Sequence, residues 1–250
     1  MNGGAGPRIT ASPKDTGQVE ILREHQAVHG QRQPPPDLWA EAGFIPPAWL
    51  KNPHLQTLWP ALFRRRPVLP LVRERLELAD GDFIDLARVP AAGPAVLVLH
   101  GLEGSLRSHY ALPLMASLRR AGLEPVFMHL RGCSGEPNRL ARSYHSGAIE
   151  DLAEVLALLA DRGRPVAAAI GFSLGGNLLL RYLGVHGPDA RLRAAVAVSV
   201  PLRLDHCAAP TDRGFSKAYH AHLMRALVAY ARDQQQRGAG PPTELDRRSL

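Results

Sequence analysis

The sequence predicts an α/β fold in which helices cover a mostly parallel sheet and an antiparallel hairpin precedes it. Three observations predict this class: short continuous apolar runs, amphipathic segments that alternate with those runs, and an Asp80-Gly81 pair between two segments of alternating side chains. Apolar runs of about four to eight residues are typical of strands buried on both faces. Helices that alternate with such strands connect them in parallel.

The hairpin is predicted around Asp80 and Gly81. Leu76 and Leu78 alternate with charged residues before the pair, and Phe83 begins a similar alternation after it. Asp-Gly readily adopts the positive φ angles of a tight turn. An antiparallel pair of strands is therefore expected before the parallel sheet.

The region after the hairpin alternates strands with helices. The predicted strands are residues 95–101, 125–130, 165–173 and 194–200, and the predicted helices are residues 108–122, 147–163 and 174–187. Ser108 is the expected N-cap of the first helix, and Gly122 is its expected C-terminal stop. Another helix is expected over 215–237, and no apolar strand follows it. The sheet should thus contain about six strands, with the last two of the eight that are usual for this architecture missing.

Four segments are expected along the chain. Residues 1–36 are rich in Gly, Pro and Gln and predict a disordered leader. Residues 37–72 hold all three tryptophans and several prolines, which predicts short helical turns and loops that pack on the domain. Residues 73–235 form an incomplete α/β core, and residues 236–250 form a flexible tail.

Composition argues against several classes of partner. The net charge is +7 and the pI is about 10.0, but the arginines are scattered and cluster only at residues 64–66, which predicts a solvated surface without a nucleic-acid groove. Cys133 and Cys207 are too far apart in sequence to predict a disulfide framework, so a reducing compartment is expected. There is neither a signal-like apolar segment nor a run of about 20 apolar residues. We expect a soluble, cytoplasmic protein without stable membrane insertion. The sequence does not indicate an oligomeric state.

The sharpest chemical motif is Gly171-Phe172-Ser173-Leu174-Gly175, a match to G-x-S-x-G between a predicted strand and a predicted helix. In that context a serine lies on a strained turn with its Oγ above the sheet, and small residues two positions away avoid clashes. Ser173 is the candidate nucleophile, and the backbone N–H of Leu174 is a candidate oxyanion donor. The alternative is a glycine-rich turn with an incidental N-cap serine.

Two further loops follow predicted strands. His100-Gly101-Leu102 contains the second candidate oxyanion donor, the backbone N–H of Leu102, while His100 is interpreted as a loop-orienting histidine bonded to backbone. Residues 131–135 contain Cys133, a disfavoured alternative nucleophile because no histidine follows at a motif spacing. None of the histidines has the spacing of a zinc motif, and neither a metal nor another cofactor is predicted.

With these motifs, the chain resembles the YheT-like branch of the α/β-hydrolase family. The shared segments are residues 46–60, 100–110, 131–139, 144–147, 171–177 and 214–219, within about residues 44–235. The resemblance implies a serine hydrolase of carboxylic esters, of the short-chain carboxylesterase or acylglycerol-lipase kind. Its substrate would be a small-molecule ester or a lipid. It also implies that Ser173 is the nucleophile and that the N–H groups of Leu102 and Leu174 are the oxyanion donors.

The chain departs from the family pattern in the part of the triad that should follow Ser173. In the family, an Asp after a later strand and a His in a loop after the last strand complete the triad, and no matching segment follows here. Four aspartates and three histidines lie downstream without the expected context, and none is assigned to the triad: Asp205, Asp212, Asp233, Asp246, His206, His220 and His222. We therefore expect a C-terminally truncated hydrolase. The alternative is a catalytically inactive hydrolase fold that acts as a binding or interaction protein. A basic nucleic-acid or membrane-surface protein is indicated by the pI alone.

Overall fold

The computed structural model describes residues 45–203, 221, 224–225, 227–228 and 232. The chain divides into two compact units, residues 1–56 and 57–250. Near their boundary, residues 48–63 form a 3₁₀ turn, η1 (Ala48–Leu50), and an α-helix, α3 (Pro53–Phe63), rather than one long helix. Asn52 caps α3, because its Oδ1 accepts the N–H of His54 at 2.8 Å. The predicted leader and tail, and the helix predicted over 215–237 as a whole, lie outside the described residues.

The second unit contains a sheet whose six described strands follow the order β1-β2-β4-β3-β5-β6. The strands are β1 (Val72–Glu77), β2 (Phe83–Arg88), β3 (Ala95–Leu99), β4 (Glu124–Met128), β5 (Val166–Phe172) and β6 (Ala194–Val198). β1 pairs with β2, and β2 with β4, in antiparallel fashion. β3 lies between β4 and β5 in parallel, and β6 extends the sheet in parallel from β5. The predicted hairpin and the mostly parallel sheet are confirmed.

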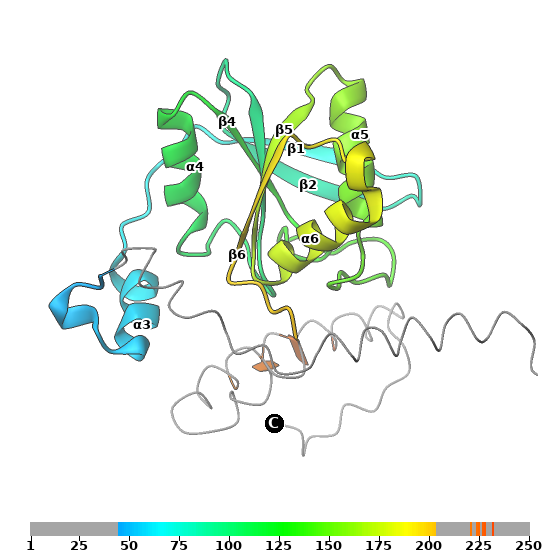
Figure 1. Ribbon diagram of the computed structural model, residues 1–250. Coiled ribbons are helices and arrows are strands. Elements are labelled where there is room, and N and C mark those ends of the chain that lie inside the picture. The colour runs from blue at the N-terminus through cyan, green and yellow to red at the C-terminus, as the bar shows by residue number, and fades with distance from the viewer. Residues whose placement is uncertain (1–44, 204–220, 222–223, 226, 229–231, 233–250) are drawn as a thin grey trace, which may run out of the picture. The chain divides into compact units, whose positions relative to one another are not determined.

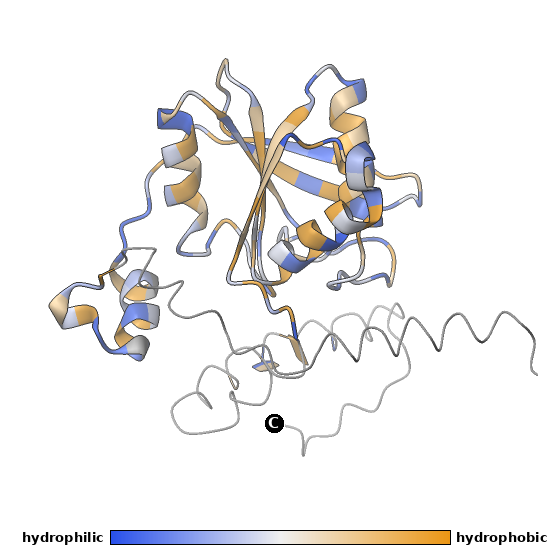
Figure 2. Ribbon diagram, in the orientation of Figure 1, coloured by the Kyte–Doolittle hydropathy of each residue, from blue (hydrophilic) through white to orange (hydrophobic). Residues whose placement is uncertain are grey.

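In the described part of the chain, three helices cover the two faces of this sheet. They are α4 (Ala111–Arg120), α5 (Glu150–Asp161) and α6 (Leu174–His186). Figure 1 shows α4 on one face, and α5 and α6 together on the other. Apolar residues concentrate on the strands and on the helix sides that face them (Figure 2). The sheet and these helices therefore have the three-layer arrangement expected when helices connect parallel strands.

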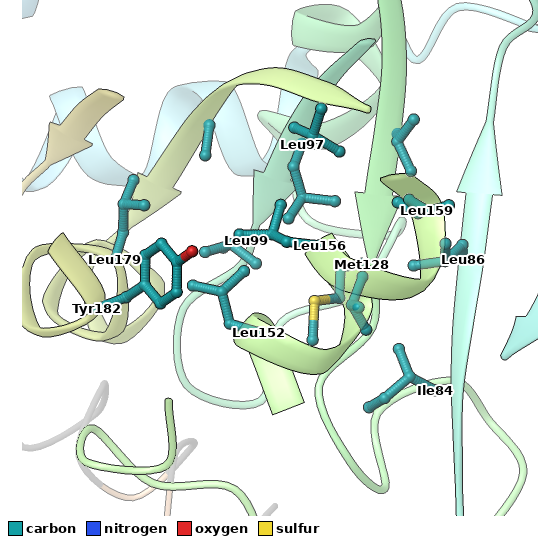
Figure 3. Packing of buried hydrophobic residues seen from close by; sticks show 14 of the residues in the cluster. Ile84, Leu86, Leu97, Leu99, Met128, Leu152, Leu156, Leu159, Leu179 and Tyr182 are labelled. Carbon is teal, nitrogen blue, oxygen red and sulfur yellow. The ribbon is translucent and has the colours of Figure 1, made fainter. Parts of the chain in front are cut away.

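Two hydrophobic clusters lie on the opposite faces of the sheet, because successive side chains of a strand point to opposite sides. On β3, Leu97 and Leu99 belong to the cluster beneath α5 and α6, while Val98 belongs to the cluster beneath α4. Figure 3 shows the larger cluster, where Leu152 of α5 and Tyr182 of α6 pack toward the strands. Every residue of β3 is buried, as the continuous apolar run predicts.

One predicted cap is wrong. α4 begins at Ala111 with Tyr110 as its N-cap, and Ser108 does not cap it. The reason is local: the Ser108 Oγ accepts the N–H of Ser105 at 3.1 Å and so helps to close a turn before the helix. Gly122 has a φ of 78° just after the helix, so the predicted C-terminal stop is confirmed.

β6 has no strand on its outer side within the described part of the chain, where it pairs only with β5. Most of its residues are exposed, including Val196. Exposed apolar edge strands favour aggregation, because their unpaired N–H and C=O groups can pair with another chain.

Candidate active site

The turn between β5 and α6 has a strained backbone at Ser173. This residue has φ 50° and ψ −117° and immediately precedes the first residue of α6. Positive φ is uncommon for a residue with a side chain and clusters at functional positions. The Ser173 N–H donates to the carbonyl of Val198 at 2.8 Å, and the Ser173 carbonyl accepts the N–H of Asn177 at 3.0 Å. Two backbone bonds thus hold the strained turn between β6 and α6.

The glycines around Ser173 make this turn possible. A Cβ on Gly171 would lie 2.5 Å from the carbonyl oxygen of Gly175, and a Cβ on Gly175 would lie 2.4 Å from the carbonyl oxygen of His100. Both distances are well below van der Waals contact, so neither position has room for a side chain without a backbone shift. The second contact also shows that the start of α6 packs directly on the end of β3.

His100 is fully buried at the end of β3, and both of its ring nitrogens bond to backbone. Nδ1 lies 2.6 Å from the carbonyl oxygen of Gly101, and Nε2 accepts the N–H of Leu130 at 3.0 Å. These partners require the neutral tautomer with the proton on Nδ1. Burial lowers the pKa of His100 to about 4. His100 therefore orients the loop, as interpreted from its position, and has no free nitrogen to act as a base.

Most backbone N–H groups at the start of the loop after β3 have an identified hydrogen-bond acceptor. The Gly101 N–H donates to the Tyr110 hydroxyl at 3.2 Å, and the Glu103 N–H donates to the Tyr144 hydroxyl at 2.8 Å. The Gly104 N–H donates to the Gly101 carbonyl at 3.0 Å. Within the described residues 101–104, the N–H of Leu102 is the one that has no partner.

The loop lies directly beside Ser173. A Cβ on Gly101 would lie 3.1 Å from the Cβ of Ser173 and 3.7 Å from its Oγ. The Ser173 hydroxyl does not cap α6. The N–H of Leu174, in the first turn of α6, also has no partner in the part of the chain that the structure describes. The structure thus brings together Ser173 and the loops that contain Leu102 and Leu174.

Cys133 lies in the loop after β4 and is partly buried against the larger hydrophobic cluster. Burial, followed by the nearby Glu103 carboxylate, raises the pKa of its thiol to about 12. A thiol with this pKa is protonated at neutral pH, whereas the thiolate is the reactive form. This supports the interpretation of Cys133 as a small residue that fills a tight loop.

Sequence reasoning missed the charged cluster around Arg131, whose side chain is 1% exposed. The Arg131 guanidinium contacts the carboxylates of Asp80, Asp82 and Asp151, each at 2.7 Å. The amide of Asn138 donates to Asp82 at 2.8 Å. Burial alone would lower the pKa of Arg131, but the ion pairs with Asp151 and Asp80 raise it. The cluster ties the hairpin turn to the loop after β4 and to α5.

Sequence reasoning also missed Tyr110 and Tyr144 as functional residues, although they lie in the segments Ser108–Tyr110 and Tyr144–Gly147 that carry the family resemblance.

The seven downstream aspartates and histidines weighed for the triad all lie outside the described residues. Within the described residues, no group of three or more His, Cys, Asp and Glu side chains could hold a metal ion. No helix in the described part of the chain has the length and apolar character needed to cross a bilayer.

Comparison with known proteins places the chain in a family. Residues 94–236 match the family described as alpha/beta hydrolase fold. The Escherichia coli K12 protein named "Putative esterase YheT" is 46% identical over 198 residues, which cover 77% of this chain and 58% of that protein. Bovine Phospholipase ABHD3 is 31% identical over 169 residues, which cover 63% of this chain and 41% of that protein.

A crystallised esterase from Pyrococcus furiosus has the same fold, with a TM-score of 0.51 and 20% identity over 73% of this chain and 68% of that one. The chain spans less than two thirds of the length of the two sequence relatives, 58% of the bacterial protein and 41% of the bovine one. The chain belongs to the α/β-hydrolase family and is a homologue of the E. coli protein YheT.

Proposed function

We propose that the chain belongs to a serine hydrolase of carboxylic esters, with Ser173 as its nucleophile. The observation that carries the proposal is the strained backbone of Ser173, at φ 50° and ψ −117°, beside a loop in which the N–H of Leu102 has no partner among the described residues. Strand-to-helix turns of this kind expose a serine Oγ for attack on an acyl carbon. A turn that served only to cap α6 would use the Ser173 hydroxyl as the cap, and it does not.

The proposed reaction proceeds by acyl transfer. The Ser173 Oγ attacks the ester carbonyl carbon and gives up its proton to a general base, and the N–H groups of Leu102 and Leu174 stabilise the developing oxyanion. The alcohol then leaves with a proton, and water releases the acid from the acyl-enzyme. Both nitrogens of His100 are engaged with backbone, so the base comes from elsewhere. In the described part of the chain, no histidine is recorded in a hydrogen bond to Ser173.

The proposed substrate is a small-molecule ester or a lipid ester. The names of two relatives support this class, one being an esterase by name and the other a phospholipase. Arginines scattered along the chain do not favour a nucleic-acid partner. We also propose a cytoplasmic location, supported by the wide spacing of the two cysteines in the sequence.

The test is hydrolysis of p-nitrophenyl acetate and butyrate by the purified chain beside its Ser173→Ala variant. With a general base supplied within the chain, wild type should hydrolyse both esters, and the variant should lose roughly 10⁴-fold to 10⁶-fold in kcat, or fall to the detection limit. Circular dichroism melts of the two proteins show that both are folded. Equal rates in both proteins would contradict the proposal, and folded proteins that are both inactive would leave either a fragment of a hydrolase or a hydrolase fold used for binding.

A further inference from the structure

The loop after β3 is held by two tyrosines that come from different parts of the chain. Tyr110 directly precedes α4, and Tyr144 lies in the long connection between β4 and α5. Their hydroxyls accept the N–H groups of Gly101 and Glu103, the residues on either side of Leu102. The two flanking donors are therefore occupied, and the donor between them is left for a ligand.

Tyr144 bonds twice to Glu103. Its hydroxyl oxygen accepts the Glu103 N–H at 2.8 Å, and its proton is donated to the Glu103 Oε1 at 2.9 Å. Glu103 has a φ of 52°, a conformation that is costly for a residue with a side chain. The double contact explains how this conformation is held, because one hydroxyl fixes both the backbone and the side chain of the strained residue.

Tyr110 connects the same loop to the nucleophile turn. Its ring stacks on Phe172 with centroids 4.1 Å apart and an interplanar angle of 18°. Phe172 is the last residue of β5 and directly precedes Ser173. A shift of Tyr110 would thus be transmitted to both Gly101 and the residue before Ser173.

We infer that Tyr110 and Tyr144 are positioning residues, which direct the Leu102 N–H toward the oxyanion of an acyl group on Ser173. The inference rests on the proposed function, because a positioned donor matters only if Ser173 reacts. Neither hydroxyl contacts the substrate in this account. They act through the backbone by fixing the N–H groups on both sides of the donor.

The test uses the full chain and the variant Tyr144→Phe, with Tyr182→Phe as a matched control. Tyr182 is a buried tyrosine whose hydroxyl also accepts a backbone N–H, that of Arg191, but it lies on α6 away from this loop. Amide hydrogen exchange followed by NMR reads the Glu103 N–H directly. Exchange at Glu103 should accelerate at least about tenfold in Tyr144→Phe and remain unchanged in Tyr182→Phe.

Kinetics with p-nitrophenyl butyrate then separate positioning from general stability. In Tyr144→Phe, kcat should fall roughly tenfold to a hundredfold while KM stays within about twofold. The reason is that a misdirected donor stabilises the transition state less well but has little effect on binding of the ester. Tyr182→Phe should retain wild-type kcat. Glu103→Gln keeps an oxygen that can accept the Tyr144 proton and should retain most of the activity.

The outcomes distinguish this inference from the proposed function. Unchanged exchange at Glu103 in Tyr144→Phe would overturn the positioning role, whatever the esterase result. Faster exchange with an unchanged kcat would also overturn it. Faster exchange in a chain whose wild type hydrolyses no ester would support the hold of Tyr144 on the loop and overturn the proposed function.

Discussion

The loops that follow β3, β4 and β5 all begin at the carboxyl ends of parallel strands, yet they differ in how their polar groups are satisfied. After β4, the buried Arg131 meets three carboxylates, and Asn138 supplies a further bond to Asp82. After β3 and β5, the backbone is strained at Glu103 and Ser173, and the N–H groups of Leu102 and Leu174 lack partners among the described residues.

This difference separates a structural role from a functional one. A buried charged cluster whose members are all paired fixes the chain and leaves nothing for a ligand. An unpaired donor beside a strained serine is available to a developing oxyanion. The carboxyl ends of parallel strands are where ligands usually bind, and the candidate site lies at the loops after β3 and β5.

The largest effect on stability is expected from Arg131→Met. Removing the guanidinium takes the nearest positive charge from the buried carboxylates of Asp82 and Asp151. The free energy of unfolding should fall by about 3 to 5 kcal/mol, measured by urea denaturation. Arg142 contacts Asp80 and Asp151 from a more exposed position, so Arg142→Met should cost no more than about 1 kcal/mol. Equal effects of the two variants would show that the buried cluster is not structural.

Mild acid should destabilise the chain through His100. Its pKa is about 4 in the folded chain, below the ordinary value of 6.5, because burial disfavours the charged ring. The unfolded chain therefore binds the proton first, and stability present above pH 6.5 is lost as the pH falls toward 4. The loss should reach about 2 kcal/mol by pH 5.

Urea denaturation at pH 7 and pH 5 measures this loss, and NMR titration of the imidazole identifies its source. Burial also lowers the pKa of His129, so that residue contributes in the same direction. A His100 resonance that titrates near pH 6.5 in the folded chain would contradict the buried, neutral assignment.

A smaller effect on stability is expected from replacing either of two glycines of α6 by alanine, and the two replacements should act in opposite directions. Gly175→Ala places a Cβ 2.4 Å from the His100 carbonyl oxygen, and it should cost about 1 to 3 kcal/mol as the start of α6 shifts from β3. Gly184 has open space at its Cβ position, so Gly184→Ala should stabilise the helix by about 0.5 to 1 kcal/mol. Thermal melts of both variants measure the difference. Similar melting temperatures would mean that the contact between α6 and β3 is looser than described.

The sequence predicts the features that depend on neighbouring residues. Strand periodicity, the Asp80-Gly81 turn and the glycines around Ser173 all act within a few positions, and the structure agrees with each. The Ser108 cap failed because the hydroxyl bonds to Ser105 instead. The Arg131 cluster could not be predicted, because its partners lie 49 and 51 residues away in one direction and 20 in the other.

The hydrogen bonds between Tyr144 and the loop after β3 also join segments that are distant in sequence. Tyr144 lies 41 residues from Glu103, and no periodicity predicts that its hydroxyl bonds to a backbone N–H there. Leu102 was predicted as a donor from its place after His-Gly, but the reason that its N–H is open is visible only when the neighbouring donors are accounted for. The location of the candidate site was therefore predictable, and the means of its positioning was not.

The most direct test of the account is to label the chain with a fluorophosphonate, which reacts covalently with activated serines. Peptide mass spectrometry then locates the adduct. The account predicts one phosphonyl group on Ser173, formed much faster than on any other serine and absent from Ser173→Ala. Labelling at a different serine, or no labelling of folded protein, would contradict the assignment of Ser173 as the nucleophile.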